Sequence, residues 1–168
     1  METEKYQHPK VEQRNEHKWL HKLVGEWTYE GEAAGEPGKP DITFKGVEIV
    51  RSIGGLWVVA EGKGEMPGGG EATMIMTVGF DVQKGRYVGT WIGSMMTYLW
   101  RYDGNLDAAE NVLTLNAEGP HMTIEGKIMR YRDVIAFKSD DHRTLTAHMQ
   151  DEAGKWQTIM TAHYRRRK

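Results

Sequence analysis

The first residues that could do chemistry lie in the segment RYRDV, residues 130–134. On a β-strand, Arg130 and Arg132 would share one face, and Tyr131 and Asp133 would share the other. Arginines that face the interior would hold a carboxylate or phosphate through paired hydrogen bonds. Arginines that face outward would lie in solvent or in cross-strand ion pairs, with Tyr131 and Asp133 pointing inward. The sequence leaves both orientations open.

Two histidines add to this chemistry. His148 and His163 lie in segments that a hairpin would make neighbours. A neutral imidazole at the mouth of a barrel could bind heme iron or act as a base. The acids Glu61 and Asp133 could face inward with His148 and form an acid/base pair. These residues define two hypotheses: a heme site on His163 or His148, and a small barrel enzyme of the isomerase or hydrolase type.

Other signatures of catalysis or metal binding are weak in this sequence. His17 and His21 are four residues apart, a spacing that could share a metal ion, but no HExxH pattern accompanies them. The sequence contains no Gly-x-Ser-x-Gly elbow, no P-loop and no cysteine. We therefore predict no metal site and no catalytic residue, and the sequence favours binding over catalysis.

Large aromatic and sulfur-containing side chains recur in the second group of candidate residues. Such side chains either fill the core of a closed barrel or line a cavity for a planar or apolar ligand. In the cavity interpretation, a few polar groups would set the orientation of the ligand. The predicted ligand-binding residues are Trp57, Met76, Trp91, Tyr98, Trp100, Tyr131, Arg132 and His148.

The elements that must position these residues are almost all β-strands. Segments rich in Val, Ile, Thr, Tyr and Trp recur between short turn signals such as Gly54-Gly55. Short connectors imply antiparallel neighbours. We predict strands at residues 27–34, 42–53, 56–64, 72–81, 86–93, 96–103, 112–118, 128–139, 144–151 and 156–165. In the second of these, the apolar side chains change face at Gly46, which predicts a β-bulge there.

A meander of about ten strands is expected to close on itself, because closure removes its exposed edges. The predicted fold class is all-β, an antiparallel up-and-down closed barrel with a short N-terminal helix. The helix is expected near residues 12–24, where Trp19, Leu20 and Leu23 fall on one stripe. Gly25 follows directly, in the position where a helix often ends.

Length and charge limit the classes of partner. The 168 residues fit one domain, which we place at residues 1–168 with residues 1–11 loosely ordered. A formal net charge of −2 leaves no general electrostatic footprint for nucleic acid or an anionic membrane surface. The longest apolar stretches are too short to span a bilayer. We therefore expect a cytoplasmic protein without nucleic-acid or membrane partners, and a homodimer is compatible with the sequence.

The segment LVGEWTYEGEA resembles the Gly-x-Trp opening of the lipocalin and fatty-acid-binding superfamily. This resemblance implies that Trp27 closes the barrel floor and that a late basic residue, Arg165 or Arg166, packs on it. The wider pattern, including HKWLHKLVGEWTYEGEA, GLWVVAEGKGEM, MIMTVGFDVQKGRYVGTWIGSMMTYLWRYDG and RYRDVIAFKSDDHRTLTAHM, resembles an uncharacterised bacterial family of lipocalin-like domains of unknown function. These segments cover most of residues 17–149.

Two departures from the superfamily shape the functional prediction. The gap Gly35–Pro40 is too short for the helical lid of fatty-acid-binding proteins, and their Arg-x-Tyr is missing from the end of the sequence. The heme-binding nitrobindin-like barrels also lack a lid, but their glycine repeat is only partly present as Gly25, Gly31 and Gly35. The sequence therefore predicts a protein that holds a small apolar or aromatic molecule inside a barrel, with the enzyme and the heme protein as alternatives.

Overall fold

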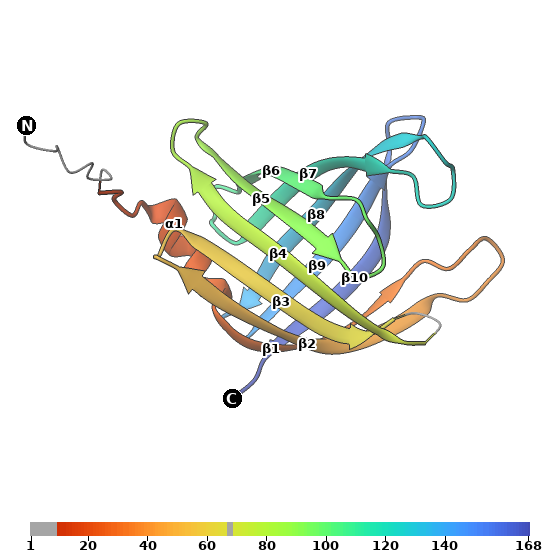
Figure 1. Cartoon of the computed structure of the whole chain (residues 1–168), viewed down its shortest axis with the longest axis horizontal. Helices are drawn as coiled ribbons and strands as arrows, with labels where there is room; N and C mark the ends of the chain where they lie inside the picture. The colour runs from red at the N-terminus through yellow and green to blue at the C-terminus, as the bar shows by residue number, and fades with distance from the viewer. Residues whose placement is uncertain (1–9, 67–68) are drawn as a thin grey trace, which may run out of the picture.

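The computed structural model describes residues 10–66 and 69–168, and this part of the chain forms ten antiparallel β-strands. Each strand pairs with its neighbours in the sequence, and β1 pairs with β10 to close the barrel (Figure 1). The predicted up-and-down closed barrel is therefore confirmed. The strands are β1 (Gly25–Ala33), β2 (Ile42–Ile53), β3 (Trp57–Glu65), β4 (Glu71–Asp81), β5 (Arg86–Gly93), β6 (Trp100–Leu106), β7 (Val112–Pro120), β8 (Ile128–Ser139), β9 (His142–Gln150) and β10 (Trp156–Arg166).

The predicted N-terminal helix is present but shorter than residues 12–24. It consists of α1 (Asn15–Leu20) and a 3₁₀ turn, η1 (His21–Leu23), and it lies across one end of the barrel (Figure 1). Side chains hold it there: the Trp19 indole N–H donates to the Glu110 carbonyl at 2.6 Å, and the Tyr87 hydroxyl donates to the Glu16 carbonyl at 2.9 Å. Tertiary contacts thus stabilise a helix too short to be stable alone.

His17 also belongs to this helix, and both of its ring nitrogens have partners within the protein. It is 3% exposed, its Nδ1 accepts a hydrogen bond from the Arg14 backbone N–H, and its Nε2 lies 3.1 Å from the Phe80 carbonyl oxygen. A neutral ring that accepts at Nδ1 and donates from Nε2 satisfies both partners. Both nitrogens are used within the protein, so His17 serves the packing of the helix on β4.

Trp27 closes the barrel beneath the helix, as the superfamily resemblance implies. Its side chain is fully buried, and its indole N–H donates to the Leu23 carbonyl at 2.8 Å. The guanidinium carbon of Arg166 lies 4.2 Å from the ring centroid, and that of Arg143 lies 4.6 Å from it. Of the two predicted arginines, Arg166 is therefore the one that packs on Trp27.

The predicted bulge at Gly46 is wrong. Strand β2 pairs regularly with both neighbours through this residue, and the register shifts lie in β8 and β10 instead. The apolar side chains change face because Glu48 points inward, while Val47 and Ile49 lie on the outer face, 39% and 55% exposed. Glycine is required at position 46 because a Cβ atom there would lie 2.4 Å from the Tyr29 hydroxyl.

The largest error in strand boundaries concerns β6, which begins at Trp100 rather than at residue 96. Ser94 turns back onto β4 instead: its N–H donates to the Thr73 carbonyl at 2.9 Å, and its hydroxyl accepts from the Thr73 N–H at 3.0 Å. Residues 94–99 consequently form a loop at the end of the barrel opposite α1. This loop brings Met95 and Met96 to the interior.

Two further expectations concern the N-terminal segment and membrane-spanning helices. The segment expected to be loosely ordered, residues 1–11, lies mostly in residues 1–9, which are outside the described residues. Among residues 10–66 and 69–168, none of the helices combines the length and apolarity needed to cross a membrane.

Candidate functional site

A cavity of about 500 Å³ occupies the barrel interior at the end opposite the helix. Its wall reaches Ala33 at the end of β1, Met66 after β3 and Met122 after β7, so its mouth lies among the connections far from α1 (Figure 1). Seven described methionines line it: Met66, Met74, Met76, Met95, Met96, Met122 and Met160. The aromatic lining consists of Tyr29, Phe44, Trp91, Trp100, Tyr102, Tyr131 and Tyr164.

The cavity exists because inward-facing residues become small toward the mouth. Near the helix, Leu113, Leu115, Ile135 and Val78 are at most 2% exposed and fill the barrel. Toward the mouth, several inward positions further along the strands carry small residues between the methionines and aromatic rings, which leaves space unfilled. These small lining residues are Ala33, Ala34, Ala60, Gly62, Ala72, Ala117 and Ala147.

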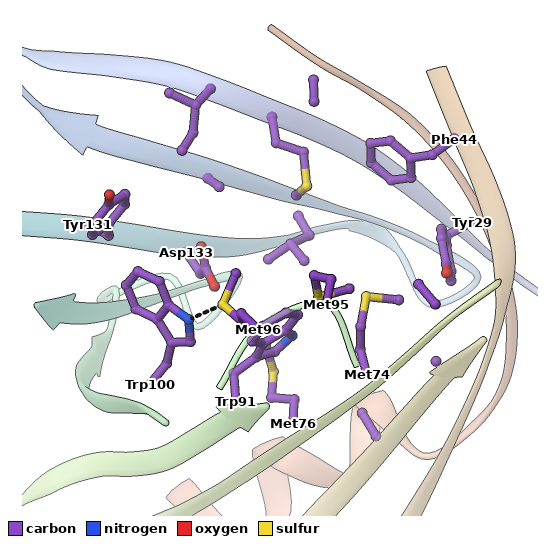
Figure 2. A pocket seen from close by; sticks show the side chains of 18 of the residues that line it. Tyr29, Phe44, Met74, Met76, Trp91, Met95, Met96, Trp100, Tyr131 and Asp133 are labelled. Atoms are coloured by element: carbon purple, nitrogen blue, oxygen red, sulfur yellow. Dashed lines mark hydrogen bonds between the residues drawn. The ribbon is translucent and has the colours of Figure 1, made fainter. Parts of the chain in front are cut away.

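Four of the eight predicted ligand-binding residues line this cavity: Met76, Trp91, Trp100 and Tyr131 (Figure 2). Trp100 lies directly on Gly119, where a Cβ atom would be 2.1 Å from the indole ring. The rings of Trp100 and Tyr131 meet edge to face with centroids 4.9 Å apart, and the Trp100 indole N–H points to the Met96 sulfur at 3.1 Å. The inward orientation expected for Met76, Trp91 and Trp100 is therefore confirmed, and of the two open orientations of the RYRDV segment the structure has the one with Tyr131 inside.

Trp57 and Tyr98 lie away from the cavity. Trp57 is 42% exposed on the outer face, where its ring covers Gly79, and its strand neighbour Val58 is the residue that points inward. Tyr98 belongs to the loop before β6, is 38% exposed and donates a hydrogen bond to the Glu118 carbonyl at 2.9 Å. The predicted inward orientation of Trp57 is wrong because it shares its face of β3 with the exposed Glu61 and Lys63, and that of Tyr98 is wrong because residues 94–99 do not continue the strand.

Arg132 and His148 also lie outside, which settles the orientation of the RYRDV segment. The Arg132 guanidinium stacks 4.0 Å from the Trp156 ring centroid, and its Nε–H donates to an Asn116 side-chain oxygen at 3.1 Å. His148 lies between the Thr146 and Thr158 hydroxyls, each 3.1 Å from a ring nitrogen. Desolvation and the neighbouring Arg132 lower the pKa of His148.

The histidine-based hypotheses do not fit this geometry. His163 is on the outer face, where its Nδ1 lies 3.0 Å from Nε2 of His142, and Glu61 is exposed beside Lys63. None of the described residues that line the cavity is a histidine. The histidine that heme would require is therefore not supplied by His163 or His148, and the proposed acid/base set is divided between the two faces of the wall.

The sequence analysis did not select Tyr102, the partner of Asp133 inside the cavity. The Tyr102 hydroxyl donates to Oδ2 of Asp133. Burial raises the pKa of Asp133 to about 6, although the hydrogen bond from Tyr102 opposes the shift. Burial and the adjacent carboxylate raise the pKa of Tyr102 well above its ordinary value. Alternation from Trp100 places Tyr102 on the inward face, so the signal was present in the sequence.

A second polar pair lies beneath the cavity. The Arg143 side chain is 3% exposed, and its Nη2 is 2.5 Å from Glu48 Oε1. The guanidinium also stacks 4.0 Å from the Tyr164 ring centroid. No motif pointed to this pair, because its partners are 95 residues apart and only barrel closure brings them together.

The charged residues of the cavity wall are all acidic. Among the described lining residues, the ionisable side chains other than tyrosines are Glu48, Glu65 and Asp133, and none is a lysine, arginine or histidine. Arg143 neutralises Glu48 from below. Asp133 therefore carries the unneutralised charge within the apolar part of the cavity (Figure 2).

The described residues form a closed up-and-down barrel without a helical lid. Its cavity is lined mainly by apolar side chains, and its charged lining residues are acidic. The chain belongs to the family described as "Protein of unknown function (DUF1579)", whose model matches residues 12–166. This confirms the predicted resemblance to a family of unknown function. No curated protein matches the chain in sequence.

Two solved structures are similar to the chain at low sequence identity. The crystal structure of Rv2717c from M. tuberculosis is 11% identical with a TM-score of 0.65, and the match covers 94% of this chain and 100% of that one. A redesigned β-barrel, mFAP1, bound to DFHBI, is 12% identical with a TM-score of 0.46, covering 91% of this chain and 100% of that one. The likeness to Rv2717c is one of fold alone.

Proposed function

We propose that the protein binds a small apolar or aromatic molecule inside the barrel. The observation that carries this proposal is the cavity of about 500 Å³ lined by methionines and aromatic rings. Its volume lies in the range of small-molecule sites, roughly 300–1,000 Å³. A barrel evolved only for stability would gain free energy by filling this space with larger aliphatic side chains.

The chemistry of the wall supports an aromatic ligand. Trp91, Trp100 and Tyr131 offer wide apolar faces, and aromatic pairs add to the free energy of simple burial. Methionine side chains adapt their shape and make favourable contacts with aromatic rings. A ligand that replaces water over these surfaces is stabilised mainly by the hydrophobic effect.

Tryptophan fluorescence tests the proposal during titration with a panel of aromatic metabolites, fatty acids and hemin. We expect a saturable change in wild-type emission, and we expect Trp91→Leu and Trp100→Leu each to weaken binding by about tenfold or more. Each variant keeps the other cavity tryptophan as reporter. Trp57→Leu is the matched control, because it removes an indole from the outer face. Binding that survives both cavity substitutions unchanged would place the ligand elsewhere.

A further inference from the structure

The geometry points to a ligand class: we infer that the cavity selects molecules whose apolar or aromatic body carries a cationic amine, held by the free carboxylate oxygen of Asp133. This inference deepens the proposed function and rests on it. It differs from the general proposal because it excludes carboxylate ligands such as fatty acids.

Asp133 has one oxygen available to a ligand. Oδ2 accepts the hydrogen bond from Tyr102, which is the one hydrogen bond that a described residue makes to this side chain, so Oδ1 is left free. The side chain is partly accessible, and its residue lines the cavity among Trp100, Tyr131 and Met96 (Figure 2). Since Tyr102 fixes the carboxyl group in place, Oδ1 is preorganised to accept a hydrogen bond from a bound molecule.

The balance of charge around the cavity favours a cation. No described lining residue is basic, and the Arg143 guanidinium lies beneath the cavity in its ion pair with Glu48. A ligand carboxylate would approach Asp133 with like charge in an environment that screens poorly. An ammonium group would instead neutralise Asp133, and the indole and phenol rings around it would add cation–π attraction.

The protonation behaviour of Asp133 also supports a cationic amine as the ligand. Burial raises the pKa of Asp133 to about 6, so the carboxylate is largely ionised at pH 7 without a basic partner. The ionisable groups that face it are the tyrosines Tyr102 and Tyr164, whose pKa values burial raises well above their ordinary value. Its paired neighbours on β7 and β9, Leu115 and Ala147, do not ionise. Ammonium binding should therefore strengthen as the pH rises through about 6.

Isothermal titration calorimetry with three naphthyl probes tests this inference at pH 7.5. The probes are 2-naphthylmethylamine, which is cationic, 2-naphthylmethanol, which is neutral, and 2-naphthoate, which is anionic. We expect the amine to bind wild-type protein at least about tenfold more tightly than the carboxylate. Asp133→Asn should abolish this preference while leaving the affinity for 2-naphthylmethanol within about threefold. Glu61→Gln, which removes an outward carboxylate, should preserve the preference.

The outcomes separate the two proposals. If none of the three probes binds wild-type protein, the proposed function is overturned for aromatic ligands of this size. If the probes bind with equal affinity, or 2-naphthoate binds most tightly, the charge selection is overturned and the proposed function stands.

Tyr102→Phe provides a second test should Asp133→Asn fail to fold. Because the hydrogen bond from Tyr102 lowers the pKa of Asp133, its loss should shift the pH midpoint of amine binding upward. A midpoint equal to that of wild-type protein would contradict the role of Asp133.

Discussion

The two ends of the barrel are built from the same ten strands, but one end is filled by side chains and the other encloses a cavity. At the helix end, Trp27 is fully buried between Arg143 and Arg166, and Leu20 fills the remaining space. At the mouth, small residues and methionines surround an unfilled volume of about 500 Å³. The comparison suggests that stability is concentrated at the closed end, which leaves the open end free to accommodate a ligand.

Polar groups differ between the ends in the same way. At the closed end, the Arg166 guanidinium donates to the Val24 and Lys22 carbonyls at 2.7 and 2.9 Å. Arg143 pairs with Glu48 through Nη2, and among the described residues its buried Nε has no hydrogen-bond partner. At the open end, Asp133 has a hydroxyl partner on one oxygen only. The difference is one of access: the unpaired Arg143 Nε is fully buried, whereas the carboxyl group of Asp133 lines the cavity, where a ligand can reach it.

The largest expected effect is at the closed end. Trp27→Ala removes a fully buried indole and the surface on which two guanidinium groups stack, so it should lower the free energy of unfolding by about 3–5 kcal/mol. Urea unfolding monitored by circular dichroism measures the change. Trp91→Leu at the open end should have a much smaller effect on stability. Equal losses at both ends would contradict the division of roles.

The sequence predicted the closed end better than the open end. Turn spacing and strand composition were sufficient for the barrel, and the Gly-x-Trp resemblance located Trp27 and one of the two candidate arginines. The residues of the floor are close in sequence or occur at a chain end, where a family pattern identifies them. No local signal identified the Arg143–Glu48 pair, because only the barrel register brings it together.

At the open end, alternation showed which residues share a face but did not always show which face is inside. In β4 one face is clearly more apolar, and Met76 was assigned correctly. In β6 the assignment was correct for Trp100 but not for Tyr98, and for β8 the sequence analysis left both orientations open. In β3 the face of Trp57 also carries Glu61 and Lys63, and because this signal was not used, Trp57 was misplaced. The volume of the cavity depends on which small residues from several strands meet at one level, and this is a property of the register rather than of any segment.

The next largest effect concerns pH and Asp133. Its pKa in the folded protein is about 6, above the ordinary value of 3.8, so the folded state retains a proton that the unfolded state releases between these values. The stability that this group contributes is present below pH 4 and is lost as the pH rises through about 6. The difference in free energy of unfolding between wild-type protein and Asp133→Asn should change by roughly 3 kcal/mol at most between pH 4 and pH 7.5, in favour of the variant at high pH.

Urea unfolding of both proteins at the two pH values measures this difference, and titrations common to both proteins cancel. Burial of the ionised Asp133 carboxylate destabilises the fold at neutral pH. A bound amine would offset this cost by neutralising the charge. A difference that stays constant with pH would mean that Asp133 is well solvated, which would also weaken its role in ligand selection.

The smallest effect gives the sharpest comparison, because it uses two inward positions on one strand. Val58 is 2% exposed in the filled half of β3, and Ala60, the next inward residue, lines the cavity. Val58→Leu adds one carbon to a packed region and should cost about 1–3 kcal/mol of unfolding free energy. Ala60→Leu adds three carbons but extends into open space, so its effect on stability should be smaller, and it should weaken binding of 2-naphthylmethanol. If the larger addition costs more than the smaller one, the space at the mouth is not available to a ligand.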